Sequence, residues 1–273
     1  MNFGDVAGRG LVLLGCGKMG GALLDGWFAG GLPAAAVTVL EPAPSPTLAA
    51  RAAGGLRLNA ELPPDPAVAV LAVKPQMMGA ALPRLAALGG GGTLFVSIAA
   101  GTTLATLEAA LGAGTPIVRA MPNTPAAIGR GITALIGNAA VDAPGLDLAE
   151  GLLGAVGQTV RVGAEAELDA VTALSGSGPA YVFLLIEAMA SAGVAQGLAP
   201  ELAQSLARAT VVGAGALADS AAGTPPSQLR IDVTSPGGTT AAALEVLMAE
   251  GGLEDLMRRA IAAGAARSRE LAA

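Results

Sequence analysis

The chain has 273 residues, with 15 basic and 21 acidic side chains, a formal net charge of −6, one cysteine and no histidine. Without histidine, a Ser/His/Asp or Cys/His nucleophile pair, a histidine-based zinc site and a histidine proton relay are excluded, and we expect no metal. The lone Cys16 cannot form an intrachain disulfide, which suits a reducing, cytoplasmic location. The acidic balance argues against nucleic acid as a partner. The length favours about two domains.

The apolar composition, 53% hydrophobic against 13% charged residues, raises the question of a membrane protein. Residues 85–107 carry no charge over a span that could cross a bilayer, but glycines at 89–92 and at 101 interrupt it. Asp5 and Arg9 precede the first apolar run, which is not the pattern of a signal peptide. We therefore expect a soluble globular protein with no membrane partner.

The first half alternates short apolar runs with helical segments, as a parallel sheet with crossover helices requires. The expected strands are 11–14, 37–40, 56–58, 68–73, 94–98, 117–120, 132–136 and 159–162, and the expected helices are 21–29, 46–53, 77–88, 104–111 and 144–153. Most of these strands are continuously apolar, which is typical of strands covered by helices on both faces. The fold class is therefore α/β, with a mostly parallel N-terminal sheet.

From about Glu165 the pattern is helical only, which predicts a dinucleotide-binding domain at 1–163 and an all-helical domain at 164–273. Helices are expected at 179–192, 200–219 and 253–271. The first of these is apolar on all sides, with Glu187 as its only charge, so it must be buried. We expect a homodimer built on the helical domain; the alternative is a central core helix in a monomer.

A glycine-rich loop, G-C-G-K-M-G at 15–20, follows the first strand and opens the first long helix. In a βαβ unit these glycines allow a tight turn at Gly15, approach of a pyrophosphate at Gly17 and close helix–strand contact at Gly20. The phosphates would lie on the helix N-terminus. Lys18 either contacts a phosphate or points to solvent. The loop predicts dinucleotide binding.

Glu41 ends the second strand, 21 residues after Gly20. A carboxylate there accepts hydrogen bonds from the adenosine ribose and repels a 2′-phosphate, which favours NAD(H). The alternative is a solvent-facing carboxylate, because the proline-rich segment at 42–46 could turn Glu41 away.

Further polar loops follow the strands and precede the helices of the second half. Lys74-Pro75-Gln76, Ala99-Ala100-Gly101 and M-P-N-T-P at 121–125 should lie at the carboxyl edge of the sheet. Two more polar loops each precede the start of a helix: S-G-S-G-P at 175–179 and T-S-P-G-G-T-T at 234–240. Such a loop can bind a carboxylate ligand at the helix N-terminus, or it can cap the helix without any ligand.

Six segments together carry a family resemblance. They are G-C-G-K-M-G (15–20), A-V-K-P-Q (72–76), S-I-A-A-G (97–101), R-A-M-P-N-T-P-A (119–126), S-G-S-G-P-A-Y (175–181) and V-T-S-P-G-G-T-T (233–240). In this order and spacing the chain resembles the pyrroline-5-carboxylate reductase family over nearly its whole length. The resemblance implies a Rossmann domain, a helical dimerisation domain and reduction of the cyclic imine to L-proline by NADPH or NADH, the last step of proline biosynthesis.

The resemblance also implies the site residues. The cofactor contacts would be Gly15, Cys16, Gly17, Lys18, Met19, Gly20, Asn59, Ala72, Val73, Lys74 and Pro75, beside Glu41. The substrate carboxylate would be held by Ser235, Gly237, Gly238 and Thr240, with Thr240 near the ring nitrogen. Two positions depart from the family pattern, which often has Asn or Gln in place of Lys18 and, in many NADPH-preferring members, Ser or Arg near the end of the second strand. The cofactor preference therefore stays open.

The chemistry fits a chain without histidine. A cyclic imine is more basic than a carbonyl oxygen, so solvent can protonate it, and the enzyme must mainly orient it against the nicotinamide. We expect no indispensable acid, with Thr240 donating a hydrogen bond. A β-hydroxyacid dehydrogenase would need a lysine in the helix after the glycine-rich loop at 175–179, and a short-chain dehydrogenase would need Tyr-x-x-x-Lys; neither is present. The remaining alternative is an NAD(P)-binding redox-sensing regulatory module without turnover.

Overall fold

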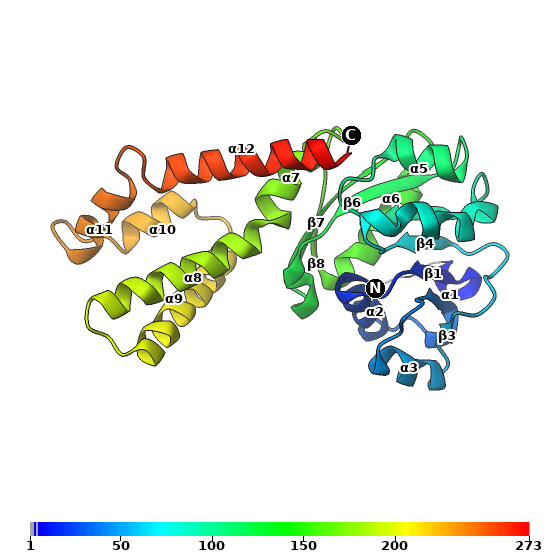
Figure 1. The fold of residues 1–273 in the computed structure, drawn as a ribbon, viewed down its shortest axis with the longest axis horizontal. Coiled ribbons are helices and arrows are strands. Elements are labelled where there is room, and N and C mark those ends of the chain that lie inside the picture. Colours follow the sequence, from blue (N-terminus) through cyan, green and yellow to red (C-terminus); the bar gives the residue numbers. More distant parts are fainter. Residues whose placement is uncertain (1–2, 4, 273) are drawn as a thin grey trace. The chain divides into compact units, whose positions relative to one another are not determined.

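The sheet organises the first part of the chain. The structure is a computed structural model that describes residue 3 and residues 5–272, and within them one eight-stranded sheet has the order β3-β2-β1-β4-β5-β6-β7-β8 (Figure 1). The strands are β1 (Leu11–Leu14), β2 (Val37–Leu40), β3 (Arg57–Leu58), β4 (Val68–Leu71), β5 (Leu94–Ser97), β6 (Ile117–Met121), β7 (Gly131–Gly137) and β8 (Gly157–Arg161). All neighbours pair in parallel except β6 with β7. The mostly parallel α/β fold is confirmed, and the order reverses between β1 and β4, where such sheets bind ligands.

Burial on both faces explains the apolar runs. Every residue of β1, β2, β4 and β5 is buried. In β1, Leu11 and Leu13 belong to one apolar cluster, whereas Val12 and Leu14 belong to another on the opposite face, as the two-residue period of a strand requires. Trp27 is fully buried in the first cluster and donates its indole N–H to the carbonyl of Leu152 at 2.8 Å.

Most of the expected helices are found, one is wrong, and three short helices, at residues 6–9, 167–171 and 226–232, were not predicted from the sequence. The helices are α1 (Val6–Arg9), α2 (Lys18–Ala29), α3 (Pro46–Ala53), α4 (Met78–Ala81), α5 (Leu104–Leu111), α6 (Ala143–Leu153), α7 (Glu167–Val171), α8 (Gly178–Ala195), α9 (Pro200–Ser220), α10 (Pro226–Asp232), α11 (Thr239–Leu247) and α12 (Leu253–Ala272). The single helix expected at 77–88 is wrong: only α4 is α-helical, and residues Leu82–Leu88 form a 3-10 helix. Pro83 explains the break, since it has no N–H to donate and its ring clashes with the preceding turn.

The chain packs as two compact units. One comprises the residues up to Gly176 together with those from Gly264 onward, and the other comprises Ser177–Ala263. The division expected at 163/164 follows the change in composition, but packing with the sheet continues beyond it. Within the first unit, Ser268 of α12 donates a hydrogen bond to Oδ1 of Asp169 in α7 at 2.6 Å. The start and the end of the helical region are therefore tied together in that unit.

The apolar helix α8 is not buried within one chain. None of its residues is buried, and Phe183 and Leu184 are 60% and 63% exposed. The stretch Glu167–Ala195 is long and apolar enough to cross a membrane by length and composition alone, a candidate distinct from residues 85–107 considered above. Burial of α8 inside a monomer, the alternative to a homodimer, is therefore wrong, and its apolar surface needs a partner.

This surface gives a test of the expected homodimer. Leu184→Glu places a charge on the exposed face of α8, where it would have to be desolvated in a subunit interface. We expect sedimentation to show dissociation into monomers at micromolar concentration. Ala110→Glu, on an exposed position of α5, is the control and should keep the assembly of the unmodified chain. An unchanged assembly in Leu184→Glu would contradict an interface at this position.

Candidate active site

The glycine-rich loop connects β1 to α2 by a turn that two of its glycines make possible. Gly15 has φ +88°, and a Cβ there would lie 2.9 Å from the carbonyl oxygen of Ala72. A Cβ at Gly20 would lie 2.5 Å from the carbonyl oxygen of Gly15. Around Gly17, in contrast, no atom lies within 4 Å of the Cβ position. Gly15 and Gly20 are thus required by the fold itself, whereas Gly17 leaves open space for a ligand.

Helix α2 begins directly behind this loop. Its N-cap is Gly17, which has no side chain that could accept from the first turn. The N–H groups at the start of α2 and the helix dipole therefore favour an anion beside Gly17. This geometry fits the pyrophosphate of a dinucleotide.

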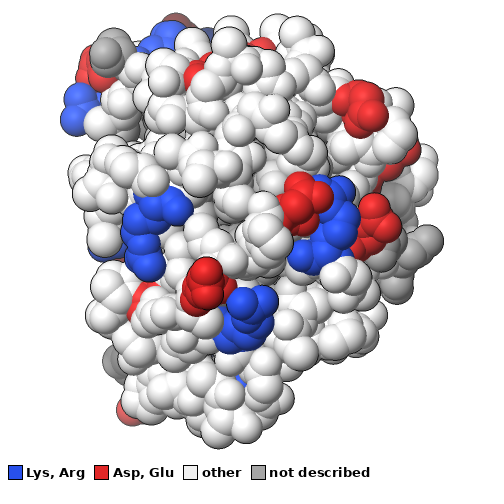
Figure 2. Space-filling view, turned by 90° about the vertical axis from the view of Figure 1, so that its right-hand side faces the viewer, with Lys and Arg blue, Asp and Glu red and all other residues white. Residues whose placement is uncertain are grey.

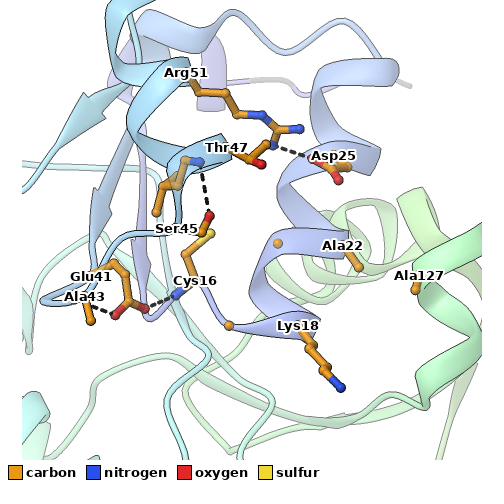
Figure 3. A pocket seen from close by; sticks show the side chains of 13 residues that line it. Cys16, Lys18, Ala22, Asp25, Glu41, Ala43, Ser45, Thr47, Arg51 and Ala127 are labelled. Carbon is orange, nitrogen blue, oxygen red and sulfur yellow. Dashed lines mark hydrogen bonds and ion pairs between the residues drawn. The ribbon is translucent and has the colours of Figure 1, made fainter.

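A cavity of about 540 Å³ opens beside the loop (Figure 3). It is lined by Cys16, Gly17, Lys18, Gly21, Ala22, Asp25, Glu41, Ala43, Ser45, Thr47, Leu48, Arg51 and Ala127. Of the predicted cofactor contacts, the structure brings Cys16, Gly17, Lys18 and Glu41 together here. The sequence analysis missed Asp25 and Arg51, which form an ion pair from α2 and α3. Their spacing carries no motif, so only the packing of the two helices reveals them.

Glu41 is directed at the loop and not at solvent, which decides between the two orientations left open above. Its Oε2 accepts from the backbone N–H of Cys16 at 2.8 Å, and its Oε1 accepts from that of Ala43 at 3.1 Å. Parallel pairing places Leu14 opposite Leu40, and the N–H of Gly15 donates to the carbonyl of Leu40 at 2.9 Å. The end of β2 therefore lies beside the glycine-rich loop.

Asn59 holds Glu41 and is not among the residues that line the cavity. Its Oδ1 accepts from the N–H of Glu41 at 2.9 Å, and its Nδ2 donates to the carbonyl of Glu41 at 2.8 Å. Its own N–H donates to Val39 at 2.8 Å. With φ +50°, Asn59 is the one residue other than glycine with positive φ in the described part of the chain. The side chain thus extends the pairing of β3 with β2.

Cys16 has a thiol that stays protonated at neutral pH. Burial raises its pKa to about 11, and the negative charge of Glu41 acts in the same direction. A thiolate is the reactive form of cysteine, so the raised pKa makes Cys16 a weaker nucleophile at neutral pH than an ordinary cysteine. Its contribution to the cavity is the backbone N–H that binds Glu41 and the bulk of its side chain.

The segment after β4 forms the wall behind the loop. The N–H of Ala72 donates to the carbonyl of Leu14 at 2.8 Å, and a Cβ on Gly15 would contact both Ala72 and Val73. Lys74 and Pro75 follow at the same edge, where a 3-10 turn (Pro75–Met77) begins. Ala72 and Val73 therefore pack against the loop, while Lys74 and Pro75 do not line the cavity.

Two of the polar loops found in the sequence lie side by side in the first unit. Asn123 donates from Nδ2 to the carbonyl of Ser175 at 3.2 Å, and its Oδ1 accepts from Ile132 at 2.9 Å. Ser175 belongs to a π-helical turn, Thr172–Gly176, which sequence patterns do not signal. Such turns are frequent at functional sites.

A buried ion pair near these loops was also missed. Arg119 of β6 is 6% exposed, and its guanidinium lies 2.6 Å from Oε1 of Glu165. The same oxygen accepts from the N–H of Leu104 at the start of α5 at 2.8 Å. The pair joins three segments that are distant in the sequence, and removing either partner would leave an uncompensated charge.

The predicted substrate residues lie in the second unit at the start of α11. Gly237 has φ +67°, and Gly238, the N-cap, donates its N–H to the carbonyl of Ser235 at 3.0 Å. No side chain caps α11, so its first N–H groups can donate hydrogen bonds to an anionic ligand. Thr240 is partly buried in the first turn, whereas Ser235 and Gly237 are exposed. The four residues therefore lie on one short segment that suits a carboxylate.

Family models match both parts of the chain. One described as "Pyrroline-5-carboxylate reductase dimerisation" matches residues 165–271, and one described as "NADP oxidoreductase coenzyme F420-dependent" matches residues 11–101. The first shows homo-oligomerisation through the helical region. A dimerisation region accounts for the exposed apolar surface of α8.

Curated relatives cover nearly the whole chain. A pyrroline-5-carboxylate reductase of Pseudomonas aeruginosa is 44% identical over 96% of both chains, and one of Pisum sativum is 39% identical over 96% of this chain and 95% of its own.

Solved structures agree with the curated relatives. A pyrroline-5-carboxylate reductase from Coxiella burnetii has a TM-score of 0.90 at 35% identity, covering 97% of this chain and 99% of its own. The pyrroline carboxylate reductase of Plasmodium falciparum, solved with NADP bound, has a TM-score of 0.82 at 28% identity, covering 97% and 98%. Fold, glycine-rich loop and sequence identity along the full length thus agree, and this chain belongs to the pyrroline-5-carboxylate reductase family, whose members are NAD(P)H-dependent oxidoreductases.

Proposed function

We propose that this chain reduces 1-pyrroline-5-carboxylate to L-proline with NADPH or NADH, as the last step of proline biosynthesis. The observation that carries this proposal is 44% identity, over 96% of the chain, to a relative of that name. The direct experiment adds pyrroline-5-carboxylate to the full chain and a reduced nicotinamide cofactor, and follows cofactor absorbance and proline formation. Cofactor binding without turnover would favour the redox-sensing module instead.

The start of α11 is the proposed carboxylate site. The substrate carries one carboxylate, and the uncapped N–H groups that follow Gly238 offer donors for it, with Ser235 in contact with Gly238. Thr240, in the same turn, would donate a hydrogen bond near the ring nitrogen. Holding the carboxylate fixes the ring orientation, which is the main requirement for reaction with a positioned hydride donor.

The cofactor cavity is the proposed binding site of the dinucleotide. When bound, NAD(P)H supplies the hydride. Gly15, Cys16, Gly17, Lys18, Met19 and Gly20 would surround the pyrophosphate, Glu41 would face the ribose, and Ala72, Val73, Lys74 and Pro75 would continue the wall beside the loop. Asn59 would act through Glu41, because both polar groups of its side chain bind the backbone of that residue.

The proton is the second reactant, and the chain offers no histidine to deliver it. An imine nitrogen is basic enough to take a proton from water, so the protein needs only to orient the iminium and to hold its carboxylate. Thr240 therefore has an orienting role in this proposal, and no single side chain is an indispensable acid.

The location and partners follow from the same family membership. We expect a cytoplasmic homodimer, or a higher homo-oligomer, in which a second subunit and not a membrane covers α8. On the face shown in Figure 2, acidic side chains lie beside several of the basic ones, and wide uncharged areas surround these groups. This face has no continuous basic surface of the kind that binds nucleic acid, in keeping with the expectation that nucleic acid is not a partner.

Two glycine variants test the cofactor site. Gly17→Val adds atoms where the chain itself leaves open space, so its free energy of unfolding should fall by less than about 1 kcal/mol. The Kd for NAD(P)H should rise at least about tenfold, because the added atoms occupy the position of the pyrophosphate. Gly20→Ala, whose Cβ would lie 2.5 Å from the carbonyl oxygen of Gly15, should instead lose about 1–3 kcal/mol of stability. Unchanged cofactor binding in a folded Gly17→Val protein would contradict the site.

A threonine variant tests the proton hypothesis. Thr240→Ala should slow hydride transfer about 10- to 100-fold, the value of one hydrogen bond to a charged group. Single-turnover kinetics with saturating cofactor measure this step, and Thr240→Ser, which keeps the hydroxyl, is the control. If Thr240→Ala abolished the step as completely as omission of the cofactor, the orienting role would be wrong.

The alkylation rate of Cys16 as a function of pH tests the raised pKa of its thiol in the cavity. Because the pKa of Cys16 is raised from 9.0 to about 11, its thiolate fraction near pH 8 should be about 100-fold below that of an ordinary thiol. Alkylation by iodoacetamide, read by mass spectrometry of the intact chain, should be correspondingly slow and should accelerate up to about pH 11. Denatured chain is the control. A rate in the folded chain that levels off near pH 9 would show an ordinary thiol.

A further inference from the structure

The cofactor cavity contains a fixed carboxylate at the point where a dinucleotide's adenosine ribose would lie. Glu41 is bound through both oxygens to backbone N–H groups, those of Cys16 and Ala43. A carboxylate has about four acceptor positions, so two remain for other donors. Cys16, whose N–H binds this carboxylate, directly precedes Gly17, beside which the pyrophosphate would lie. Glu41 can therefore accept hydrogen bonds from a ribose without leaving its partners.

The position of Glu41 depends on Asn59. The amide of Asn59 binds both the N–H and the carbonyl of Glu41, at 2.9 and 2.8 Å. Asn59 adopts φ +50° to do so, a conformation that asparagine tolerates better than most residues. The backbone of Glu41 is thus fixed although the proline-rich segment 42–46 follows it.

Among the described residues, neither cation of the cavity lining forms an ion pair with Glu41. Arg51 forms an ion pair with Asp25, and its guanidinium lies 5.6 Å from the ring centre of Phe28. Figure 3 shows Lys18 extending from the loop away from Glu41. Both cations of the lining thus lie apart from Glu41 in Figure 3, and Arg51 already has Asp25 as its carboxylate partner.

We propose that Glu41 makes this chain selective for NADH over NADPH, and that Asn59 is the positioning residue for Glu41. The inference rests on the proposed function and specifies its cofactor. The 2′-hydroxyl of NADH donates a hydrogen bond to a carboxylate, whereas the 2′-phosphate of NADPH brings negative charge against it. The Plasmodium relative was solved with NADP bound, so the selectivity is proposed for this chain and not for the whole family.

Cofactor binding without substrate is the first test. The Kd values of the full-length protein for NADH and NADPH are measured by the fluorescence of the reduced nicotinamide. We expect NADH to bind at least about tenfold more tightly, and kcat/KM with pyrroline-5-carboxylate to show the same preference. Equal or tighter binding of NADPH would overturn the proposal.

Variants identify the responsible residues. Glu41→Gln removes the charge at nearly constant shape and should lower the NADH preference at least about tenfold, mainly through tighter binding of NADPH. Glu61→Gln removes a carboxylate outside the cavity lining and should leave the ratio unchanged. An unchanged ratio in Glu41→Gln, or an equal change in Glu61→Gln, would refute the role of Glu41.

The positioning role of Asn59 has its own test. Asn59→Gly removes the amide but tolerates positive φ, so the backbone need not change. The ratio of the two Kd values should fall in Asn59→Gly, while the double variant with Glu41→Gln should show no further fall beyond Glu41→Gln alone. Additive effects would show that Asn59 acts independently of Glu41.

The outcomes separate the two proposals. Turnover with NADPH as good as with NADH would overturn the selectivity and leave the reductase function standing. Selective binding of NADH without turnover of pyrroline-5-carboxylate would overturn the function and leave the role of Glu41 standing.

Discussion

The close approach of the glycine-rich loop to the neighbouring strand is the constraint on which the cofactor side of this protein depends. Because Gly15 and Gly20 lack side chains, β1 turns directly into α2 against Ala72. The turn directs the start of α2 at the cavity and brings the N–H of Cys16 to Glu41. A side chain at either glycine would separate strand from helix and displace the carboxylate at the end of β2. The proposed anion site at α2 and the position of Glu41 therefore depend on the same packing contact.

The absence of histidine is compatible with this family's reaction because the substrate is an imine. Reduction of a carbonyl needs a positioned acid, whereas an iminium needs orientation against the hydride donor. The polar groups of the chain are arranged accordingly. They include backbone N–H groups at the starts of α2 and α11, neither of which has a side-chain cap. Burial and the negative charge of Glu41 raise the pKa of the thiol of Cys16 in this cavity, which lowers its reactivity as a nucleophile.

The high apolar content has two separate origins. One is the sheet, whose central strands are buried on both faces. The other is α8, which is apolar and yet exposed within one chain. Membership of its region in a dimerisation family accounts for the second. Composition alone does not separate these origins, since a buried core, a subunit interface and a membrane span all consist of the same residues.

The sequence by itself determined the α/β class, most strands, the glycine-rich loop and the family, because these depend on local periodicity and short motifs. It did not determine the break at Pro83, the π-helical turn at Thr172–Gly176 or the extent of the compact units, which depend on packing between distant segments. Only the tertiary structure decided the orientation of Glu41. Asn59 is separated from it by 17 residues, and the amide reaches its backbone only because β3 lies beside β2.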